Sequence, residues 1–220
     1  MQTFDTPAAI TAVLNVPAGR VQLIAADRPD TTVEVRPADP GRNRDVRTAE
    51  QTTVTYTDGV LSIRVPEAGN QLLGPGSVEV TVQLPAGSDV EAEAASAELR
   101  VVGRLGALAF DGAYRRIKID EAASVRLTAV DGDVEIGRLT GPAEISTARG
   151  DIRITEAHRG TLALSTQLGD ITVDTAPGTS AALDAATGHG RITNALRNDG
   201  TTTLDIRATT AQGDITARSL

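Results

Sequence analysis

The 220-residue chain contains no cysteine and no tryptophan, and its only aromatic residues are two phenylalanines and two tyrosines. Without cysteine, a disulfide framework and thiol redox chemistry are excluded. A thick globular core takes much of its buried area from large aromatic side chains. Because the apolar residues here are almost all aliphatic, we expect a thin core of alanine, valine, leucine and isoleucine.

Long apolar runs and excess positive charge are also lacking. No stretch of about 18 apolar residues occurs, so we expect no membrane insertion. The first 20 residues have neither the basic start nor the apolar run of a signal peptide, which favours a cytoplasmic location, with the cell surface as the alternative. The net charge of −8 disfavours binding to nucleic acid, because phosphates would be repelled.

Helical periodicity is nearly absent, whereas apolar and polar residues alternate along most of the chain. Residues 89–99 are rich in alanine and glutamate, yet they alternate as well and are predicted to be strand. Two polar stretches with proline and glycine, residues 38–51 and 66–76, are predicted to be exposed loops. Asp58-Gly59 lies between two short alternating runs and predicts a β-hairpin.

A short phrase of glycine, a polar residue and alternating apolar positions recurs in the second half of the chain. It begins at Gly132, Gly150, Gly169, Gly190 and Gly213, which are 18, 19, 21 and 23 residues apart. A second set of alternating segments lies between these glycines, so each repeat of about 20 residues contains two strands. A repeat of this period is typical of a stacked architecture.

The two strands of one repeat would form a flattened coil whose inward side chains alternate with outward ones. Stacked coils pair their backbones at about 4.8 Å and share one continuous aliphatic core. We therefore predict an all-β fold, a β-solenoid with a less regular N-terminal strand region as its cap. The chain is expected to be one elongated domain, with N-terminal strands and loops in residues 1–87 and regular coils in residues 88–220.

The repeat also predicts the inward side chains and a partner. The chain ends at Leu220, soon after the last phrase, and a bare sheet edge invites pairing with another chain. We therefore expect self-association through the C-terminal sheet edge, beside an interaction with an unknown protein partner. The expected inward residues are Val134, Ile152, Ile171, Ile192 and Ile215 on one wall and Leu127, Ile145, Leu164 and Leu183 on the other.

The recurring aspartates are the first candidates for chemistry. Stacked corners would bring Asp133, Asp151 and Asp170 into a column, where a divalent cation would relieve their repulsion. However, the known calcium-binding solenoid repeat is about nine residues long and denser in glycine, and Arg191 occupies the fourth position, where it would neutralise the column internally. We interpret the phrase as corner chemistry, in which glycine provides a positive φ and aspartate binds nearby backbone amides. No metal ligand and no cofactor is predicted.

The remaining candidates carry less chemistry. His158 and His189 lack partners at metal-binding spacing and are predicted to be exposed corner residues. No nucleophile elbow, phosphate-binding loop or dinucleotide-binding motif occurs. Enzymes that act on polysaccharides also use stacked β-coils, with carboxylates in a cleft, but the aromatic platforms for sugar rings are missing. Glu135 and Arg153 are expected to be solvated outward neighbours, so no catalytic residue is predicted.

Three features together carry a family resemblance: the Gly-Asp phrases at 132, 150, 169 and 213, the strand 78–84 with its Pro-Ala-Gly exit, and the opening strand 21–25. With them the sequence resembles a bacterial family of domains of unknown function labelled "putative adhesin". The resemblance implies a β-solenoid built on Gly-Asp-Val/Ile turns and carries over no catalytic residue. We expect a non-catalytic scaffold or protein-interaction module; an envelope or surface adhesin is the second hypothesis and a polysaccharide-acting enzyme the third.

Overall fold

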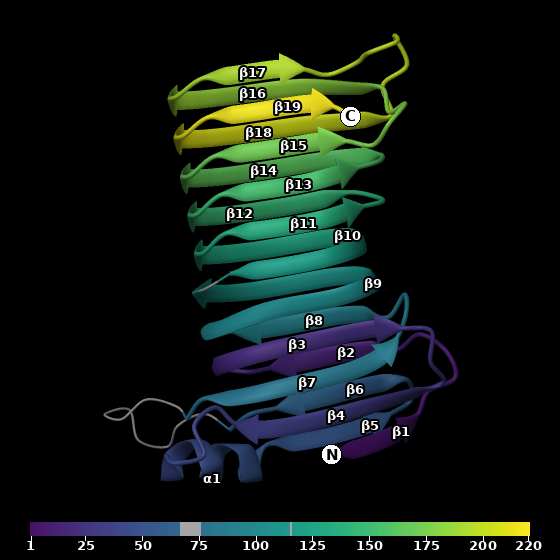
Figure 1. Ribbon diagram of the computed structural model, residues 1–220, viewed down its shortest axis with the longest axis vertical. Helices are drawn as coiled ribbons and strands as arrows, with labels where there is room; N and C mark the ends of the chain where they lie inside the picture. Colours follow the sequence, from purple (N-terminus) through teal and green to yellow (C-terminus); the bar gives the residue numbers. More distant parts are fainter. Residues whose placement is uncertain (67–75, 115) are drawn as a thin grey trace. The chain divides into compact units, whose positions relative to one another are not determined.

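The computed structural model describes residues 1–66, 76–114 and 116–220, and these residues are mostly β-strand (Figure 1). The chain divides into two compact units, residues 1–115 and residues 116–220. Each unit contains stacked parallel strands, so the predicted all-β, solenoid-like fold is confirmed. The single domain of residues 1–220 stays a prediction.

Unit 1 combines parallel coils with antiparallel strands. Its parallel strands form two walls, β6–β2–β8 and β7–β3–β9. Antiparallel strands β4 and β5 pair with β7 and β6, and thereby cover the end of this stack. The predicted less regular N-terminal region is confirmed by this mixture. The elements are β1 (Gln2–Asp5), β2 (Thr11–Asn15), β3 (Ala18–Ala26), β4 (Asp30–Pro37), α1 (Asn43–Gln51), β5 (Thr53–Thr57), β6 (Val60–Arg64), β7 (Val78–Pro85), β8 (Asp89–Ala94) and β9 (Ser96–Tyr114).

The loop predicted over residues 38–51 is wrong in its second part, which forms helix α1. The helix has one aliphatic residue larger than alanine, Val46, so apolar periodicity could not reveal it. A polar contact holds it instead: Asp45 is 2 % exposed, and its carboxylate accepts a hydrogen bond from the Ser77 amide at 3.1 Å. Of the loop predicted over residues 66–76, residues 67–75 lie outside the described part of the chain.

Two other local predictions for unit 1 are confirmed. Asp58 and Gly59 have φ values of 49° and 80° and connect the antiparallel strands β5 and β6, as a tight hairpin turn requires. Residues 89–99 are strand, divided between β8 and the beginning of β9.

Unit 2 is the regular part of the fold and consists of two walls of parallel strands. One wall has the order β10–β12–β14–β18–β16, and the other has the order β10–β11–β13–β15–β19–β17. The long strand β10 contributes to both walls, its first part pairing with β11 and its second part with β12. The strands are β10 (Ile117–Asp131), β11 (Val134–Leu139), β12 (Ala143–Arg149), β13 (Ile152–Ala157), β14 (Gly160–Leu168), β15 (Ile171–Thr175), β16 (Ala181–His189), β17 (Ile192–Ala195), β18 (Leu204–Gln212) and β19 (Ile215–Ser219).

The coils of unit 2 are not stacked in the order of the sequence. The last coil, β18–β19, lies between coil β14–β15 and coil β16–β17 (Figure 1). The predicted bare edge at the C-terminal strand is therefore wrong, since β19 is paired on both sides. Among the described residues of unit 2, the strands that pair with one other strand are β16 and β17.

Side-chain composition explains this order. The inward residues of β18 and β19 include Leu204, Ile206 and Ile215, whereas β16 begins with Ala181 and β17 has Asn194 at an inward position. Placing the more apolar coil inside buries it between two neighbours, which the hydrophobic effect favours. The lengths of the connections agree with this order. The connection from β15 to β16 must pass one coil, a distance of roughly 10 Å, and it has five residues, 176–180. The connection from β13 to β14 joins adjacent coils and has two residues.

A coil near the beginning of the chain is enclosed in the same way. In unit 1, β2 pairs with both β6 and β8, and β3 pairs with both β7 and β9. Coil β2–β3 therefore lies between coil β6–β7, which follows it in the sequence by more than 30 residues, and coil β8–β9. Each unit thus encloses the coil nearest to its end of the chain.

The core of unit 2 is the aliphatic column that the alternation predicts. Val134, Ile152, Ile171 and Ile215 are at most 1 % exposed, and Leu127, Ile145 and Leu164 are buried opposite them. Two predicted core residues differ: Ile192 is 43 % exposed and Leu183 is half-buried. Both lie in coil β16–β17, which has a neighbour on one side in the described part of the chain.

Candidate functional site

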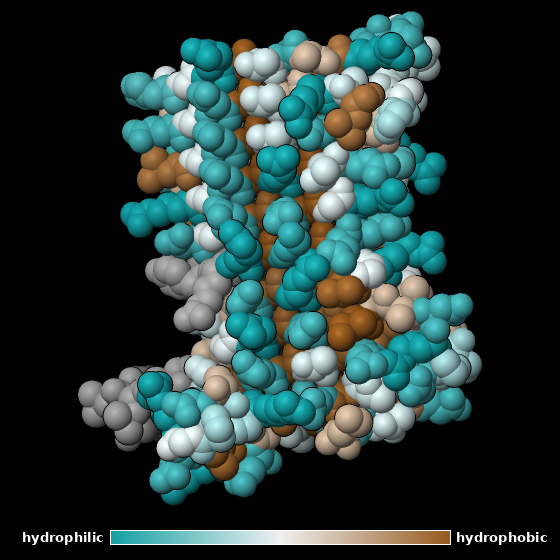
Figure 2. All heavy atoms as spheres, viewed as in Figure 1, coloured by the Kyte–Doolittle hydropathy of each residue, from teal (hydrophilic) through white to brown (hydrophobic). Residues whose placement is uncertain are grey.

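The Gly-Asp corners of unit 2 form a ladder of side-chain to backbone hydrogen bonds. The carboxylate of Asp133 accepts a hydrogen bond from the Asp151 amide at 3.0 Å, and that of Asp151 accepts one from the Asp170 amide at 2.8 Å. Asp170 then receives the Asp214 amide at 2.7 Å, and Asp214 receives the Arg191 amide at 2.8 Å. Hydrophilic side chains follow the side where β11, β13 and β15 begin (Figure 2). The corner role predicted for these aspartates is confirmed.

The glycines allow consecutive corners to lie very close together. Gly150 has a φ of +123°, and a Cβ at this position would lie 2.3 Å from the Gly132 carbonyl oxygen. A second ladder satisfies these carbonyl groups: the hydroxyls of Thr166, Thr210 and Thr187 donate to the carbonyls of Gly150, Gly169 and Gly213 at 3.0 to 3.1 Å. At Gly150, Gly169 and Gly213 the corner is therefore held both by an aspartate ladder and by a threonine ladder.

Arg191 lies at the end of the ladder, so the predicted internal neutralisation of the aspartate column is wrong. The order of corners in space is Gly132, Gly150, Gly169, Gly213 and Gly190. In the described part of the chain no further corner lies beyond Arg191, so no carboxylate is required at this position to accept a corner amide. Each ladder carboxylate binds the next amide instead of gathering around one point, and no group of three or more acidic, histidine or cysteine side chains suited to a metal ion occurs among the described residues.

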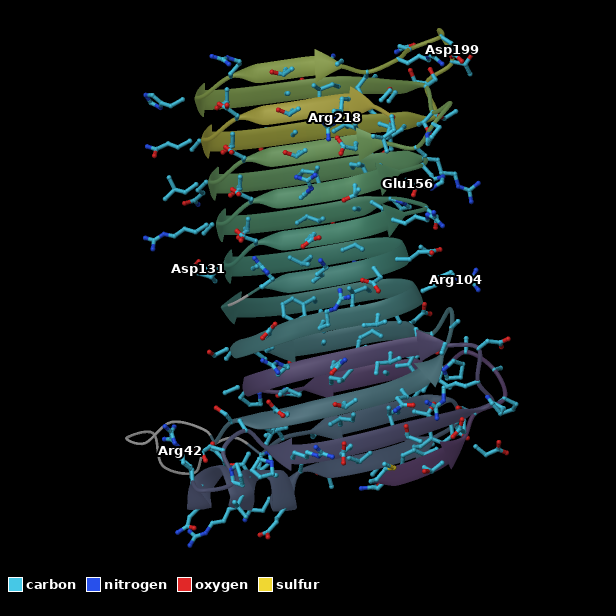
Figure 3. The ribbon with its side chains drawn as sticks, in the orientation of Figure 1. Arg42, Arg104, Asp131, Glu156, Asp199 and Arg218 are labelled. Atoms are coloured by element: carbon cyan, nitrogen blue, oxygen red, sulfur yellow. The ribbon has the colours of Figure 1, made fainter. Side chains whose placement is uncertain are left out.

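A buried carboxylate on β15 forms a two-bond ion pair with the neighbouring strand. Asp174 is 2 % exposed, and Arg218 on β19 binds it through Nε at 2.6 Å and Nη2 at 3.0 Å. The Asp174 carboxylate raises the pKa of Arg218 through this hydrogen bond and through its charge. Figure 3 shows Arg218 on β19. Alternation could not predict this pair, because Asp174 follows the inward residue Val173 and is buried nevertheless.

A chain of ion pairs crosses one wall of unit 2. Arg138 on β11 lies 3.8 Å from Glu121 and 3.1 Å from Glu156. His158, predicted to be an exposed corner residue, is half-buried and its Nε2 lies 3.1 Å from the Glu156 carboxylate. His189 is exposed, as predicted. These ion pairs are mostly exposed to solvent, so each contributes little to the stability of the fold.

The predicted outward neighbours Glu135 and Arg153 do lie side by side on β11 and β13. The ion pair of Glu135 is formed with Lys118 on β10, at 2.9 Å. This arrangement is a solvated cross-strand contact, and it places no pair of carboxylates in a cleft.

The opposite wall has an uncharged strip. Thr128, Ser146, Ser165 and Thr209 are exposed and in register on β10, β12, β14 and β18. The adjacent outward row is also uncharged and consists of Val130, Ala148, Gln167, Ala211 and Gly188. On the other side of the hydroxyl row, Arg126 and Glu144 pair at 3.4 Å. We call the two uncharged rows the neutral strip.

A shallow hollow lies where the loops of unit 2 meet the end of β19. Its lining includes Thr179, Arg197, Asn198 and Ser219. Beside it, Asp199 accepts the Thr201 amide at 3.0 Å, and this bond and a bond with Ser180 lower the pKa of its carboxyl. The polar groups of Asp199, Thr201 and Ser180 are therefore hydrogen-bonded within this loop.

The Toastrack DUF4097 family, a domain of unknown function, matches residues 13–219. The chain belongs to this family. A search of curated proteins found no match. The expected membership of a family of domains of unknown function is confirmed by the family match.

The solved structures that match this chain are distant from it in sequence. A putative adhesin from Bacteroides fragilis has a TM-score of 0.53 at 14% identity, over 98% of this chain and 95% of that one. A putative cell adhesion protein from Clostridium sporogenes has a TM-score of 0.39 at 14% identity, over 100% of this chain and 98% of that one. The first likeness shows the fold alone. In the described part of the chain, no helix is long and apolar enough to cross a membrane.

Proposed function

We propose that the chain is a non-catalytic binding module that contacts its partner through the β10–β12–β14–β18–β16 wall of unit 2. The observation that carries this proposal is the regular exposure of outward side chains on successive strands of a hydrogen-bonded wall. Side chains on such a wall are fixed in spacing and direction, so little conformational entropy is lost when a partner binds. The description of the similar Bacteroides fragilis structure as a putative adhesin supports this class of function.

Charge favours the neutral strip as the contact region. The chain carries a net charge of −8, and a negatively charged partner, such as a bacterial envelope surface, would be repelled by most of the protein. The neutral strip carries no charged side chain of its own, so local repulsion is reduced there, and hydroxyl groups such as those of Ser165 and Thr209 can bind sugar or peptide groups directly. We propose an envelope component as the partner and keep an intracellular protein as the alternative.

The binding proposal is tested with purified envelopes and purified cytosolic protein of the source bacterium. Ser165→Glu and Thr209→Glu place charge in the centre of the neutral strip, and Thr155→Glu places the same charge on the exposed surface of the other wall. We expect the strip variants to lose at least about tenfold in affinity for envelopes, while Thr155→Glu binds like the wild type. Equal binding by all variants, or no binding by the wild-type protein to either fraction, would exclude this surface.

Location and catalysis are tested separately. Fractionation of the host decides between the cytoplasmic location expected from the sequence and an envelope location. Release of reducing sugar from envelope polysaccharide by the wild-type protein would overturn the non-catalytic assignment, and loss of that release in Glu135→Gln would locate the activity on the opposite wall.

A further inference from the structure

Coil β16–β17 is the open end of the stack in unit 2. Ile192 is 43 % exposed, whereas Ile215 and Ile171, which occupy the same position in the next two coils, are at most 1 % exposed. On the other wall, Leu183 is half-buried beside the fully buried Ile206. Edge strands also present backbone groups that can pair with another chain. In unit 1, by contrast, antiparallel strands cover the end of the stack.

The open end is electrically balanced in an otherwise acidic protein. Residues 181–200 contain two aspartates, Asp184 and Asp199, and two arginines, Arg191 and Arg197, whereas the whole chain has a net charge of −8. A second copy of the chain would therefore meet less repulsion at this end than at an average surface. The positions of these charges also matter, because Arg191 directly precedes β17 and Asp199 lies in the loop that follows it. Figure 3 labels Asp199 in this loop.

The corner ladder disfavours continuation of the stack by a parallel coil. Each inner corner amide binds an aspartate of the neighbouring coil, but the corner of coil β16–β17 has Arg191 in that position. A parallel coil added at this end would find no carboxylate for its corner amide. An antiparallel arrangement does not need that bond, since it places the beginning of one strand beside the end of the other.

From these observations we propose that two copies of the chain associate end to end about a two-fold axis, with β16 and β17 of each copy pairing antiparallel to the same strands of the partner. Such an interface is self-complementary. The Arg191 corner of one copy faces the loop with Asp199 of the other, and this contact occurs twice. Ile192 and Leu183 are covered at the same time.

The area of the proposed interface limits the affinity of the dimer. Strand β16 has nine residues, which span roughly 30 Å, and two packed walls are about 10 Å apart. This end is small compared with the roughly 800 Å² that each partner buries in a stable complex. We therefore expect a weak, concentration-dependent dimer.

Cross-linking tests the two-fold arrangement, because the chain has no cysteine of its own. Thr193→Cys introduces one thiol near the axis on β17. Thr172→Cys is the matched control, since Thr172 occupies the same outward row two coils further into the stack. We expect the Thr193→Cys protein to form a disulfide-linked dimer at least about tenfold faster, because pairing raises the local thiol concentration. Equal rates for the two variants would overturn the proposal.

Sedimentation at increasing concentration gives an independent measurement. Ile192→Lys places a charge at the open end and should raise the dimer dissociation constant at least about tenfold, whereas Thr155→Lys should leave it unchanged. Arg191→Glu should also weaken the dimer, and the additional change Asp199→Lys should restore it. Circular dichroism and thermal unfolding confirm that each variant is folded. A wild-type protein that stays monomeric at the highest soluble concentration, or a double variant no better than Arg191→Glu, would refute the arrangement.

Discussion

The glycine and the aspartate of each corner stabilise the stack in different ways. Glycine lets two chain segments approach closely at a positive φ, and aspartate binds the amide of the next corner. Because the two contributions are separable, each can be measured by its own substitution.

Gly150→Ala should destabilise the protein by about 3 kcal/mol, because it combines backbone strain with a contact of 2.3 Å to the Gly132 carbonyl oxygen. Gly178→Ala is the control, since Gly178 has a φ of +80° and no atom within 4 Å of the added Cβ. Because the Gly178→Ala variant has backbone strain without a close contact, we expect it to lose about 1–2 kcal/mol of unfolding free energy. Chemical denaturation of both variants measures the difference, and equal losses would show that close approach contributes nothing.

Asp170→Ala should cost about 1 kcal/mol, because the Asp214 amide loses its acceptor. Asp170→Asn keeps an oxygen in place and should cost less. Arg191→Ala, at the end of the ladder, should stay within about 0.5 kcal/mol of the wild type. The unfolding free energies of the three variants test the ladder, and a loss in Arg191→Ala as large as in Asp170→Ala would contradict it.

Arg218→Met should destabilise the protein by about 1–3 kcal/mol, because it leaves the buried Asp174 carboxylate without its partner. The matched control is Arg207→Met, which removes an exposed pair with Asp205 at 3.6 Å and should cost at most about 0.5 kcal/mol. Urea unfolding at neutral pH compares the two. Similar values would mean that burial adds nothing to the Asp174 pair.

At the scale of elements, alternation and corner chemistry predicted the strands and the inward rows of unit 2. They could not predict the order of coils, because the corners at Gly190 and Gly213 each have a backbone amide that the Asp170 carboxylate can accept, so either could stack on the corner at Gly169. The deciding differences were present in the sequence as weaker signals: longer connections at 176–180 and 196–203, and less apolar inward residues in β16 and β17. Helix α1 escaped detection for another reason, since a buried carboxylate anchors it and apolar periodicity does not.

Amide hydrogen exchange should reveal the order of coils directly. Residues of β19 lie between two coils, so their amides should exchange at least about tenfold more slowly than those of β17, although β19 is nearer to the end of the chain. Mass spectrometry of peptides covering residues 192–195 and 215–219 makes the comparison. Faster exchange in β19 would mean that the last coil lies outside.

At the scale of the molecule, the stacking order reverses the expected effect of deletions. Removing residues 204–220 takes out an inner coil and deprives β16 and β17 of their neighbours, so we expect the structure of unit 2 beyond β15 to be lost. Replacing residues 176–203 with a linker as short as His158–Arg159 removes the outer coil and lets β15 lead directly into β18. We expect the longer, internal deletion to be the more stable variant.

Thermal unfolding followed by circular dichroism compares these two deletion variants. The order of stability is the informative result, because a simple sequential stack would tolerate loss of its terminal coil better. A terminal deletion that unfolds at the higher temperature would therefore refute the enclosed position of β18–β19.

The enclosed coils also determine how the protein responds to mechanical force. When a chain is pulled by its ends, a coil at the edge of a stack peels away one hydrogen bond at a time and resists weakly. Here coils β2–β3 and β18–β19 are each hydrogen-bonded on two sides, so tension must break both rows of bonds. A tether near residue 220 would load the inner coil β18–β19 directly, whereas at the other end β1 would first separate from β4 before the load reaches β2–β3. From the C-terminal side the protein should therefore extend only at forces well above those needed to peel an outer coil.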